Sequence, residues 1–296
     1  MDDIEAAQAF VAWMREKRGA SRGTLDKYDR LARAWAGYLP TVLADRTAVD
    51  VEAFVGRPRR GGQVAANATI VNEMAVIGSF HRWGRERLGW GGNPAVLAGR
   101  PRVHNRQPRP VDDATWMRVW TSDLSPDRRV ALGLGYYCGL RRAELLALRA
   151  NQVWGGALVN FTRKGGGEDR FDYTDLVEHW QAKMPHLEAG RLLVPLQELA
   201  RQQSGSLLGW GTSVRPTGLN KRMSTWLVQC GLASDAFTPH QLRHSFATNL
   251  LRSGVPLDVA CDLCDHSSPT VTMRYIRTSG GRLASLRTLN TLEEAK

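Results

Sequence analysis

Two histidines and an arginine are clustered in the stretch TPHQLRHSFATNLL, residues 238–251. Thr238 followed by a proline, with Gln241 three residues further on, is the capping-box pattern of a helix N-terminus. Three side chains then share one face of that helix at i, i+3 and i+4: His240, Arg243 and His244. An imidazole and a guanidinium near a first turn, where free N–H groups and the helix dipole favour negative charge, are suited to bind a phosphate. Because many surface helices carry the same spacing, a solvated helix face is the alternative for this stretch alone.

A second stretch, CDLCDHSSPTVTMRY, offers two kinds of chemistry. Its CxxC spacing is typical of a zinc ligand pair or of a redox dithiol. A structural zinc site needs a second pair at suitable spacing, and the remaining cysteines, Cys138 and Cys230, are isolated. A redox pair is expected in a thioredoxin-like βαβ setting, which the surrounding pattern does not resemble. Cys261 and Cys264, at i and i+3 of a helix, are therefore expected to pack in the core, and we predict no metal site.

Further side chains of chemical interest lie in and around this stretch. Tyr275 ends it, nine residues after His266. The segment GLRRAELLALR breaks at its glycine and then restarts as a helix, with Arg141 and Glu144 three residues apart. The segment ALVNFTRKGGGEDRFDYT is typical of two strands around a glycine-rich turn, with Lys164 at the turn. Taken singly, each has an ordinary structural alternative: a surface arginine, a solvated lysine or a packed tyrosine.

The charge of the chain favours a polyanionic partner. The 296 residues carry a formal net charge of +11, with a pI of about 10.0. The excess is shared between residues 1–105 and 106–296, so neither part is a basic tail on a neutral body. Nucleic acid is the usual partner of such a protein. Arginine far outnumbers lysine, which suits bidentate phosphate binding, although a GC-rich genome would produce the same bias.

The apolar pattern predicts two domains of different kind. Residues 1–98 show helical spacing throughout and are expected to form a helical domain. Residues 99–110, GRPRVHNRQPRP, show no apolar period and are typical of an extended basic linker, which either lies along a DNA backbone or is a solvated tether. Residues 111–296 mix helices with a small antiparallel β-sheet, so the fold class is mainly α. The linker arginines are Arg100, Arg102, Arg106 and Arg109.

These segments together resemble the tyrosine recombinase (phage integrase) family. HxxRH followed by SFAT is similar to the second signature box of that family, GLRRAELLALR to its first box, TRKGGGEDR to its lysine hairpin, and DHSSPTVTMRY to its last segment. The N-terminal motifs SRGTLDKY and FHRWGRERLGWGGNPA resemble its core-binding domain, so the likeness spans nearly the whole chain. The resemblance implies a helical core-binding domain followed by an α+β catalytic domain, the simple two-domain type. It implies six catalytic residues: Arg141, Lys164, His240, Arg243, His266 and Tyr275.

The resemblance also implies a reaction. The phenol oxygen of Tyr275 attacks a DNA phosphodiester, expels a 5′-hydroxyl and leaves a 3′-phosphotyrosyl intermediate. Arg141 and Arg243 are expected to clamp the non-bridging oxygens. Either His240 or His266 is expected to accept the phenol proton, and Lys164 to protonate the leaving oxygen. Because the phenol pKa is ordinarily about 10, the cationic surroundings are expected to activate it. No metal, ATP or other cofactor is expected.

Three neighbours of the catalytic set are expected to support it. Glu144 can hold Arg141, and His244 is expected either to be structural or to contact and support a catalytic residue. The third neighbour departs from the family pattern: where Leu-Gly-His is usual before the last segment, this chain has Cys264, Asp265 and His266. We expect a left-handed backbone at Asp265, which aspartate tolerates less well than glycine. We also expect its carboxylate to hold the neighbouring histidine more strongly charged, or to slow catalysis.

The resemblance sets expectations for partners and role. Double-stranded DNA sites, a homodimer on each site and a homotetramer in the synapse are implied, with an accessory DNA-bending or directionality protein as a further partner. The apolar segment 281–296 is expected either to dock on the neighbouring protomer or to pack on its own domain. The chain is expected in the cytoplasm, without a membrane segment. Integration or excision of a phage or other mobile element leads, with a Xer-like chromosome-dimer resolvase, a type IB-like topoisomerase and a non-catalytic DNA-binding module as alternatives.

Overall fold

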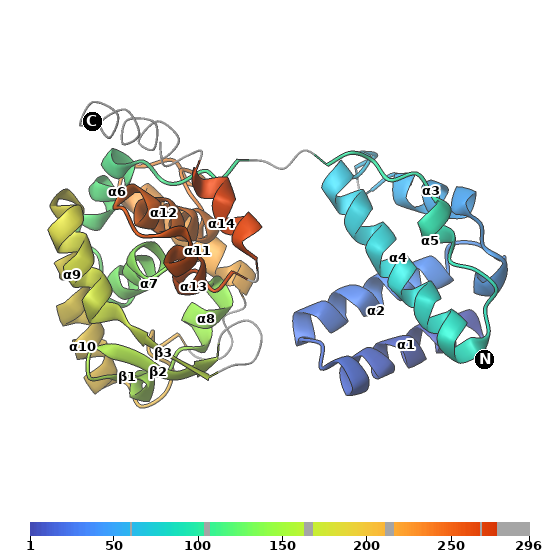
Figure 1. Ribbon diagram of the computed structural model, residues 1–296, viewed down its shortest axis with the longest axis horizontal. Coiled ribbons are helices and arrows are strands. Elements are labelled where there is room, and N and C mark those ends of the chain that lie inside the picture. Colours follow the sequence, from blue (N-terminus) through green and yellow to red (C-terminus); the bar gives the residue numbers. More distant parts are fainter. Residues whose placement is uncertain (60, 104–106, 163–167, 211–215, 267, 277–296) are drawn as a thin grey trace, which may run out of the picture. The chain divides into compact units, whose positions relative to one another are not determined.

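The structure is a computed structural model in which two compact units are distinguished, Met1–Asn105 and Arg106–Lys296. It describes residues 1–59, 61–103, 107–162, 168–210, 216–266 and 268–276 (Figure 1). The boundary between the units falls inside the segment 99–110. We describe each unit by itself, and the DNA-binding and catalytic roles expected for them remain predictions at this point.

The N-terminal unit is helical, as its apolar spacing predicts (Figure 1). Its elements are α1 (Asp3–Arg18), α2 (Arg22–Ala36), η1 (Leu43–Asp45), α3 (Ala48–Gly56), α4 (Asn67–Leu88) and α5 (Pro94–Leu97). Asp2 caps α1 through a capping box with Glu5, and Thr47 caps α3 in the same way with Asp50. The core is aromatic: Phe10 stacks on Phe80 with ring centroids 4.9 Å apart.

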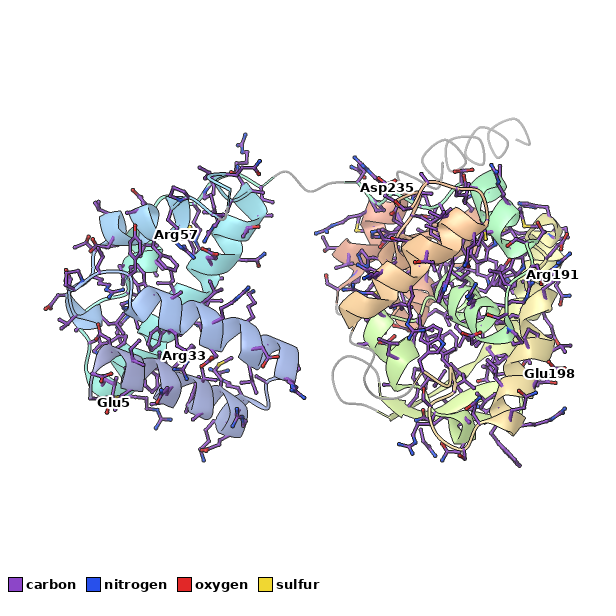
Figure 2. All side chains as sticks on the ribbon, turned by 180° about the vertical axis from the view of Figure 1, so that it is seen from behind. Glu5, Arg33, Arg57, Arg191, Glu198 and Asp235 are labelled. Atoms are coloured by element: carbon purple, nitrogen blue, oxygen red, sulfur yellow. The ribbon has the colours of Figure 1, made fainter. Side chains whose placement is uncertain are left out.

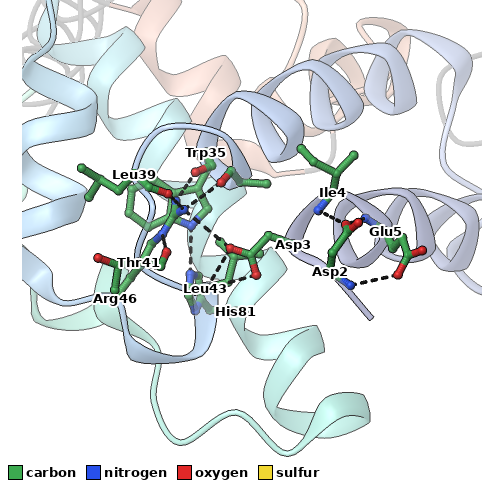
Figure 3. A network of polar contacts seen from close by, with 11 residues as sticks. Asp2, Asp3, Ile4, Glu5, Trp35, Leu39, Thr41, Leu43, Arg46 and His81 are labelled. Carbon is green, nitrogen blue, oxygen red and sulfur yellow. Dashed lines mark hydrogen bonds and ion pairs between the residues drawn. The ribbon is translucent and has the colours of Figure 1, made fainter.

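A buried arginine closes the turn between α2 and η1 (Figure 3). Arg46 is 5% exposed and donates hydrogen bonds to the backbone carbonyls of Trp35, Ala36, Leu39 and Thr41. These acceptors satisfy a charge that would otherwise be costly to bury. The Trp35 indole in turn donates from Nε1 to Nε2 of His81 at 3.0 Å. The turn is therefore fixed by one cation and one imidazole.

The buried imidazole predicts an acid-sensitive N-terminal unit. Burial, with a smaller effect of Arg46, lowers the pKa of His81 to about 4. Because this pKa lies below the unfolded value of about 6.5, the stabilisation is present above pH 6.5 and is lost as the pH falls towards 4. We expect about 2 kcal/mol of unfolding free energy to be lost between pH 7 and pH 5 from this group. The measurement is urea unfolding of wild type and His81→Gln at both pH values, with exposed His186→Gln as control. Equal pH dependence in all three proteins would contradict the assignment.

The C-terminal unit combines helices with a small sheet (Figure 1). Its helices are α6 (Asp113–Trp120), α7 (Pro126–Tyr137), α8 (Arg142–Ala147), η2 (Ala150–Gln152), α9 (Tyr173–Lys183), η3 (Pro185–Leu187), η4 (Ala189–Leu192), α10 (Leu193–Gln202), α11 (Pro216–Gln229), α12 (Pro239–Arg252), α13 (Leu257–Leu263) and α14 (Pro269–Ile276). Its strands are β1 (Val153–Trp154), β2 (Ala157–Thr162) and β3 (Glu168–Asp172).

The sheet is antiparallel with strand order β1-β2-β3. Ala157 pairs with Asp172, and Val153 pairs with Leu158. The two strands predicted around the glycine-rich turn are β2 and β3, whereas the two-residue strand β1 was not predicted, because two residues are too few to show alternation. The turn at 163–167, with Lys164, lies outside the described residues.

Helix α7 forms the centre of the C-terminal unit, and α12 packs along it. Residues 130–137 of α7 are all buried. The Trp116 ring on α6 stacks on that of Tyr136 with centroids 3.8 Å apart, and the Trp116 Nε1 donates to the Tyr137 hydroxyl at 2.9 Å. On α12, the positions that escape full burial lie at its two ends: His240, Gln241 and His244 near the N-terminus, and Leu251 and Arg252 at the C-terminus. Close packing in the core therefore fixes the position of α12, while side chains of its first two turns are accessible at the surface.

The surfaces of both units are rich in charged side chains (Figure 2). Arg33 donates to Asp29 at 2.7 Å on α2, and Arg191 pairs with Glu188 in the other unit. Figure 2 shows Arg191 and Glu198 at the edge of the C-terminal unit, pointing outward. Within the described part of the chain, every helix is too short or too polar to cross a lipid bilayer.

Candidate active site

The first two turns of α12 present the predicted histidines and arginine. The helix begins at Pro239, after the Thr238 cap. The Thr238 backbone N–H donates to Oε1 of Gln241 at 3.0 Å, which is the reach-back contact that the sequence pattern predicts. The rings of His240 and His244 lie edge to face, with centroids 4.3 Å apart. The common face inferred from the i, i+3, i+4 spacing is therefore present.

A pocket of about 320 Å³ brings the sequence-predicted side chains together from four segments of the chain. Five of the residues singled out in the sequence line it with Tyr275: Arg141, His240, Arg243, His244 and His266. Gln107, Pro108, Val271 and Arg274 complete the lining and carried no signal in the sequence. Arg106 and Lys164 lie outside the described residues, so their assignments stay predictions.

Arg243 ties two of these segments to α12. It is 6% exposed, and its Nη1 donates to the Gly139 carbonyl at 2.6 Å, while its Nη2 donates to the carbonyl of Cys264. Burial, followed by the like charge of Arg141, lowers its pKa from the ordinary arginine value. The guanidinium thus fixes the turn before α8 and the end of α13 beside each other. It does so while lining the pocket, where its charge can act on a phosphate.

The Gly139 turn has no room for a side chain. Gly139 has φ +65°, and a Cβ there would lie 2.2 Å from Cδ1 of Phe246. We expect Gly139→Ala to lower the unfolding free energy by about 2–5 kcal/mol, since a left-handed alanine is strained and the overlap adds an overpacking cost. Gly254→Ala is the matched control: φ is +87°, but no atom lies within 4 Å of its Cβ. It should lose only about 1 kcal/mol, from backbone strain. Urea unfolding measures both, and equal losses would contradict the steric argument.

Arg141 is held by two carboxylates. Its Nη1 donates to Oε1 of Glu144 at 2.8 Å, as expected, and also to a carboxylate oxygen of Asp265. Its Nη2 donates to the backbone carbonyl of Asp265 at 2.6 Å. Asp265 has φ +44°, the left-handed backbone that the sequence predicts. Burial opposes the charged form of Arg141, but the two carboxylates outweigh it and the net pKa is raised.

The structure contradicts the charge expected for His266. Burial is the largest effect, and Arg243 and Arg141 add to it, so the pKa of His266 falls to about 4. The carboxylate of Asp265 acts in the opposite direction but does not prevail. That carboxylate forms its ion pair with Arg141 rather than with the imidazole of His266. His266 is therefore neutral near pH 7, with its Nδ1 2.8 Å from Oγ1 of Thr272.

The environment of Tyr275 also differs from the expectation. Its side chain is 5% exposed, and burial raises the pKa of its phenol to about 12, with a smaller contribution from Cys264; Arg243 lowers that pKa without reversing the shift. The expected activation by cations is thus outweighed by burial. The phenol oxygen lies 2.6 Å from Nδ1 of His244, a residue expected to be structural or to support the catalytic residues from behind. The signal that could have indicated this contact is its place one turn after His240 on the pocket face.

The two cysteines of the CxxC motif are buried and are not joined in a disulfide. Cys264 is fully buried in the core cluster of this unit, and Cys261 is 6% exposed with its thiol donating to the His266 carbonyl at 3.5 Å. Packing in the core, as predicted, is what the structure shows. Within the residues described here, we find no group of three or more histidine, cysteine, aspartate or glutamate side chains placed to hold a metal ion.

The linker arginines have exposed side chains where they are described. Arg100 and Arg102 belong to the N-terminal unit, and Arg109 to the C-terminal unit. Pro108, next to Arg109, lines the pocket. DNA contact by these arginines remains a prediction.

Solved structures share this architecture. The integrase of the Tn1549 transposon in complex with circular intermediate DNA aligns with a TM-score of 0.65 at 14% identity, over 91% of this chain and 94% of that one. A lambda integrase dimer bound to a COC′ core site aligns with a TM-score of 0.63 at 15% identity, over 93% and 95%. At such identities the likeness shows the fold alone, which this chain shares with these integrases.

Sequence comparison supplies the family. Residues 210–281, which span α11 to α14, match the model of the phage integrase family. A tyrosine recombinase XerC from Rhodospirillum centenum is 30% identical over 96% of this chain and 86% of its own length. Another XerC, from Rhizobium meliloti, is 29% identical over 94% and 90%. The chain belongs to the tyrosine recombinase family, whose members are site-specific DNA recombinases that transfer DNA strands.

Proposed function

We propose that this protein cuts and rejoins DNA at specific sites through a 3′-phosphotyrosyl intermediate, with Tyr275 as the nucleophile. The observation that supports this most strongly is the single pocket lining shared by Arg141, His240, Arg243 and Tyr275. A phosphodiester in that pocket would meet two guanidinium groups and a phenol at once. Positive charge placed where the phosphoryl oxygens gain charge is the main requirement for such a transfer.

The proposed reaction needs no energy source beyond the DNA itself. Tyr275 attacks the phosphorus, the bond to the 5′ oxygen breaks, and the bond energy is kept in the phosphotyrosyl link. Arg141 and Arg243 bind the non-bridging oxygens and stabilise their charge in the transition state. Lys164 is proposed to donate the proton that the leaving 5′ oxygen takes up. A second strand's 5′-hydroxyl reverses these steps and rejoins the DNA.

Covalent attachment to DNA tests this proposal. Duplexes that the protein binds would be selected from a randomised library and rebuilt as suicide substrates, each with a nick at a different position near the centre of the site. Cleavage next to a nick releases a short fragment and traps the protein on the DNA. We expect a denaturant-resistant adduct with at least one of the nick positions. Specific binding without an adduct at any position would refute the enzyme and leave a DNA-binding module.

Assembly on DNA is proposed from the solved relatives. One lambda integrase structure is a dimer on a core site, and another is a tetramer on a Holliday junction. We propose a dimer of this chain on each site and a tetramer in the synapse, with segment 281–296 linking neighbouring protomers, in the cytoplasm. An accessory DNA-bending or directionality protein is a further proposed partner.

Two biological roles follow from different observations. Integration or excision of a phage or other mobile element is the role we propose, and the transposon and phage integrase structures share its fold. The XerC relatives favour chromosome-dimer resolution instead. Sequencing the DNA junctions made in cells decides between them, because an element integrase produces excised circles and a resolvase acts at one chromosomal locus. Relaxation of plasmids without sequence preference would indicate a topoisomerase.

A further inference from the structure

The phenol of Tyr275 has a defined hydrogen-bond partner in this pocket. Its oxygen lies 2.6 Å from Nδ1 of His244, within the range of a strong O–H···N contact. The two side chains come from α12 and α14, which are packed against each other. His244 is half-buried and Tyr275 is buried, so the contact is shielded from bulk water. A fixed, shielded acceptor at the nucleophile is the geometry that general-base catalysis requires.

The other imidazoles are placed for other tasks. The ring of His266 lies nearly parallel to that of Tyr275, with centroids 6.1 Å apart, and its Nδ1 is engaged by Thr272. His240 is exposed at the start of α12, where it can meet a phosphate oxygen. Partial burial, with the nearby arginines, lowers its pKa. His244 is therefore the imidazole that holds the phenol, and the other two line the place of the phosphate.

His244 is also in the protonation state that a base needs. Burial first, and then the neighbouring His240, Arg243 and His266, lower its pKa to about 4. A neutral imidazole has one nitrogen that accepts and one that donates. With the phenol donating to Nδ1, the ring proton is on Nε2. The titratable and charged groups that face His244 are His240 and Arg243 on α12, His266 after α13 and Tyr275 on α14.

We propose that His244 is the general base of strand cleavage, an inference that rests on the proposed function. As the phenol oxygen bonds to phosphorus, its proton passes to Nδ1 of His244. The electron pair of the broken P–O bond stays with the 5′ oxygen, which takes a proton from a separate donor. In rejoining, the imidazolium returns its proton to the phenol oxygen as the phosphotyrosyl bond breaks. The negative phosphate drawn into the pocket favours that imidazolium, because opposite charges attract across the site.

The test combines a change in the base with a change in the nucleophile's acidity. His244→Asn keeps a hydrogen-bond acceptor near the position of Nδ1 but cannot take a proton. Single-turnover cleavage of the suicide duplex by the full chain is expected to fall by about 10²-fold or more. DNA affinity, measured by gel shift, should stay within about twofold. His186→Asn, an exposed histidine on η3, is the matched control and should cleave like wild type.

Replacing Tyr275 with a fluorinated tyrosine distinguishes a general-base role of His244 from a structural role. Fluorine lowers the pKa of the phenol, so the cleavage rate depends less on a proton acceptor. Fluorotyrosine should therefore restore His244→Asn by about 10-fold while changing the wild-type rate by no more than a few-fold. Cleavage by His244→Asn at the wild-type rate, or a loss that fluorination leaves unchanged, would overturn the proposal.

If His244→Asn does not fold, the pH–rate profile of the chain with His244 in place gives an independent test. The acid limb of that profile should stay in place on fluorination, since that limb reports His244. A limb that shifts with the phenol pKa would overturn the proposal. If the wild-type chain forms no adduct with any substrate, the proposed function has failed instead, which is a distinct result.

Discussion

Tyr275→Phe is expected to abolish covalent attachment to the suicide duplex while leaving DNA binding intact. The substitution removes one oxygen, the atom that forms the bond to phosphorus, and the pocket offers no second hydroxyl in its place among its lining residues. Loss of a nucleophile typically lowers turnover by more than about 10⁴-fold. The adduct on a denaturing gel is the readout, and gel shift measures binding on the same duplex.

The control for this variant is another buried tyrosine. Tyr173 begins α9 and is 1% exposed, and it does not line the pocket. Tyr173→Phe should form adduct at the wild-type rate. The lost hydrogen bond to His244 should cost Tyr275→Phe only about 1 kcal/mol of stability, so both variants should be folded at room temperature. An adduct that persists in Tyr275→Phe would show that another residue is the nucleophile.

Arg243→Lys is expected to impair cleavage and folding stability together. Lysine keeps the positive charge but carries all its donors on one nitrogen, so it cannot span the carbonyls of Gly139 and Cys264 as the two guanidinium nitrogens do. At least one buried carbonyl then loses its partner, at a cost of about 1–3 kcal/mol. Loss of the bidentate contact to the transition state should lower the cleavage rate by about 10²–10³-fold. Urea unfolding and single-turnover cleavage measure the two effects.

Arg252→Lys is the matched control, because it makes the same change on the same helix. Arg252 pairs with Asp113 at 3.1 Å on the surface, far along α12 from the pocket residues. A surface pair of this kind contributes up to about 1 kcal/mol. We expect near wild-type stability and cleavage from it. If Arg243→Lys behaved like Arg252→Lys, the bridging role of Arg243 would be wrong.

Local patterns in the sequence were sufficient to predict where the site's helices begin. Thr238 and Gln241 predicted the start of α12, and the glycine of GLRRAELLALR predicted the break before α8. The two helix starts each depend on a few adjacent residues, since helix caps and turns are satisfied by near neighbours. The left-handed backbone at Asp265, by contrast, was expected from the family resemblance, because glycine is usual at that position.

Contacts between distant segments could not be predicted in the same way. Asp265 and Arg141 are 124 residues apart, and His244 and Tyr275 are 31 apart. Which side chains meet depends on how α8, α12 and α14 pack, and no local pattern encodes that packing. The errors on His266 and Tyr275 have the same origin. Both expectations considered nearby charges, whereas burial sets the direction of both pKa shifts.

The carboxylate of Asp265 acts as a built-in anion that is already paired with Arg141 in the pocket. The charges of Arg141 and Arg243 face those of Glu144 and Asp265, so these four groups are balanced. A phosphodiester that approaches Arg141 must exchange with a carboxylate already bound there. Small soluble anions, such as nucleotides, compete poorly for an occupied guanidinium. A duplex gripped elsewhere by the chain presents its phosphate at high effective concentration and can win that exchange. We therefore expect the pocket to favour a phosphate of DNA that is already bound over a small anion from solution.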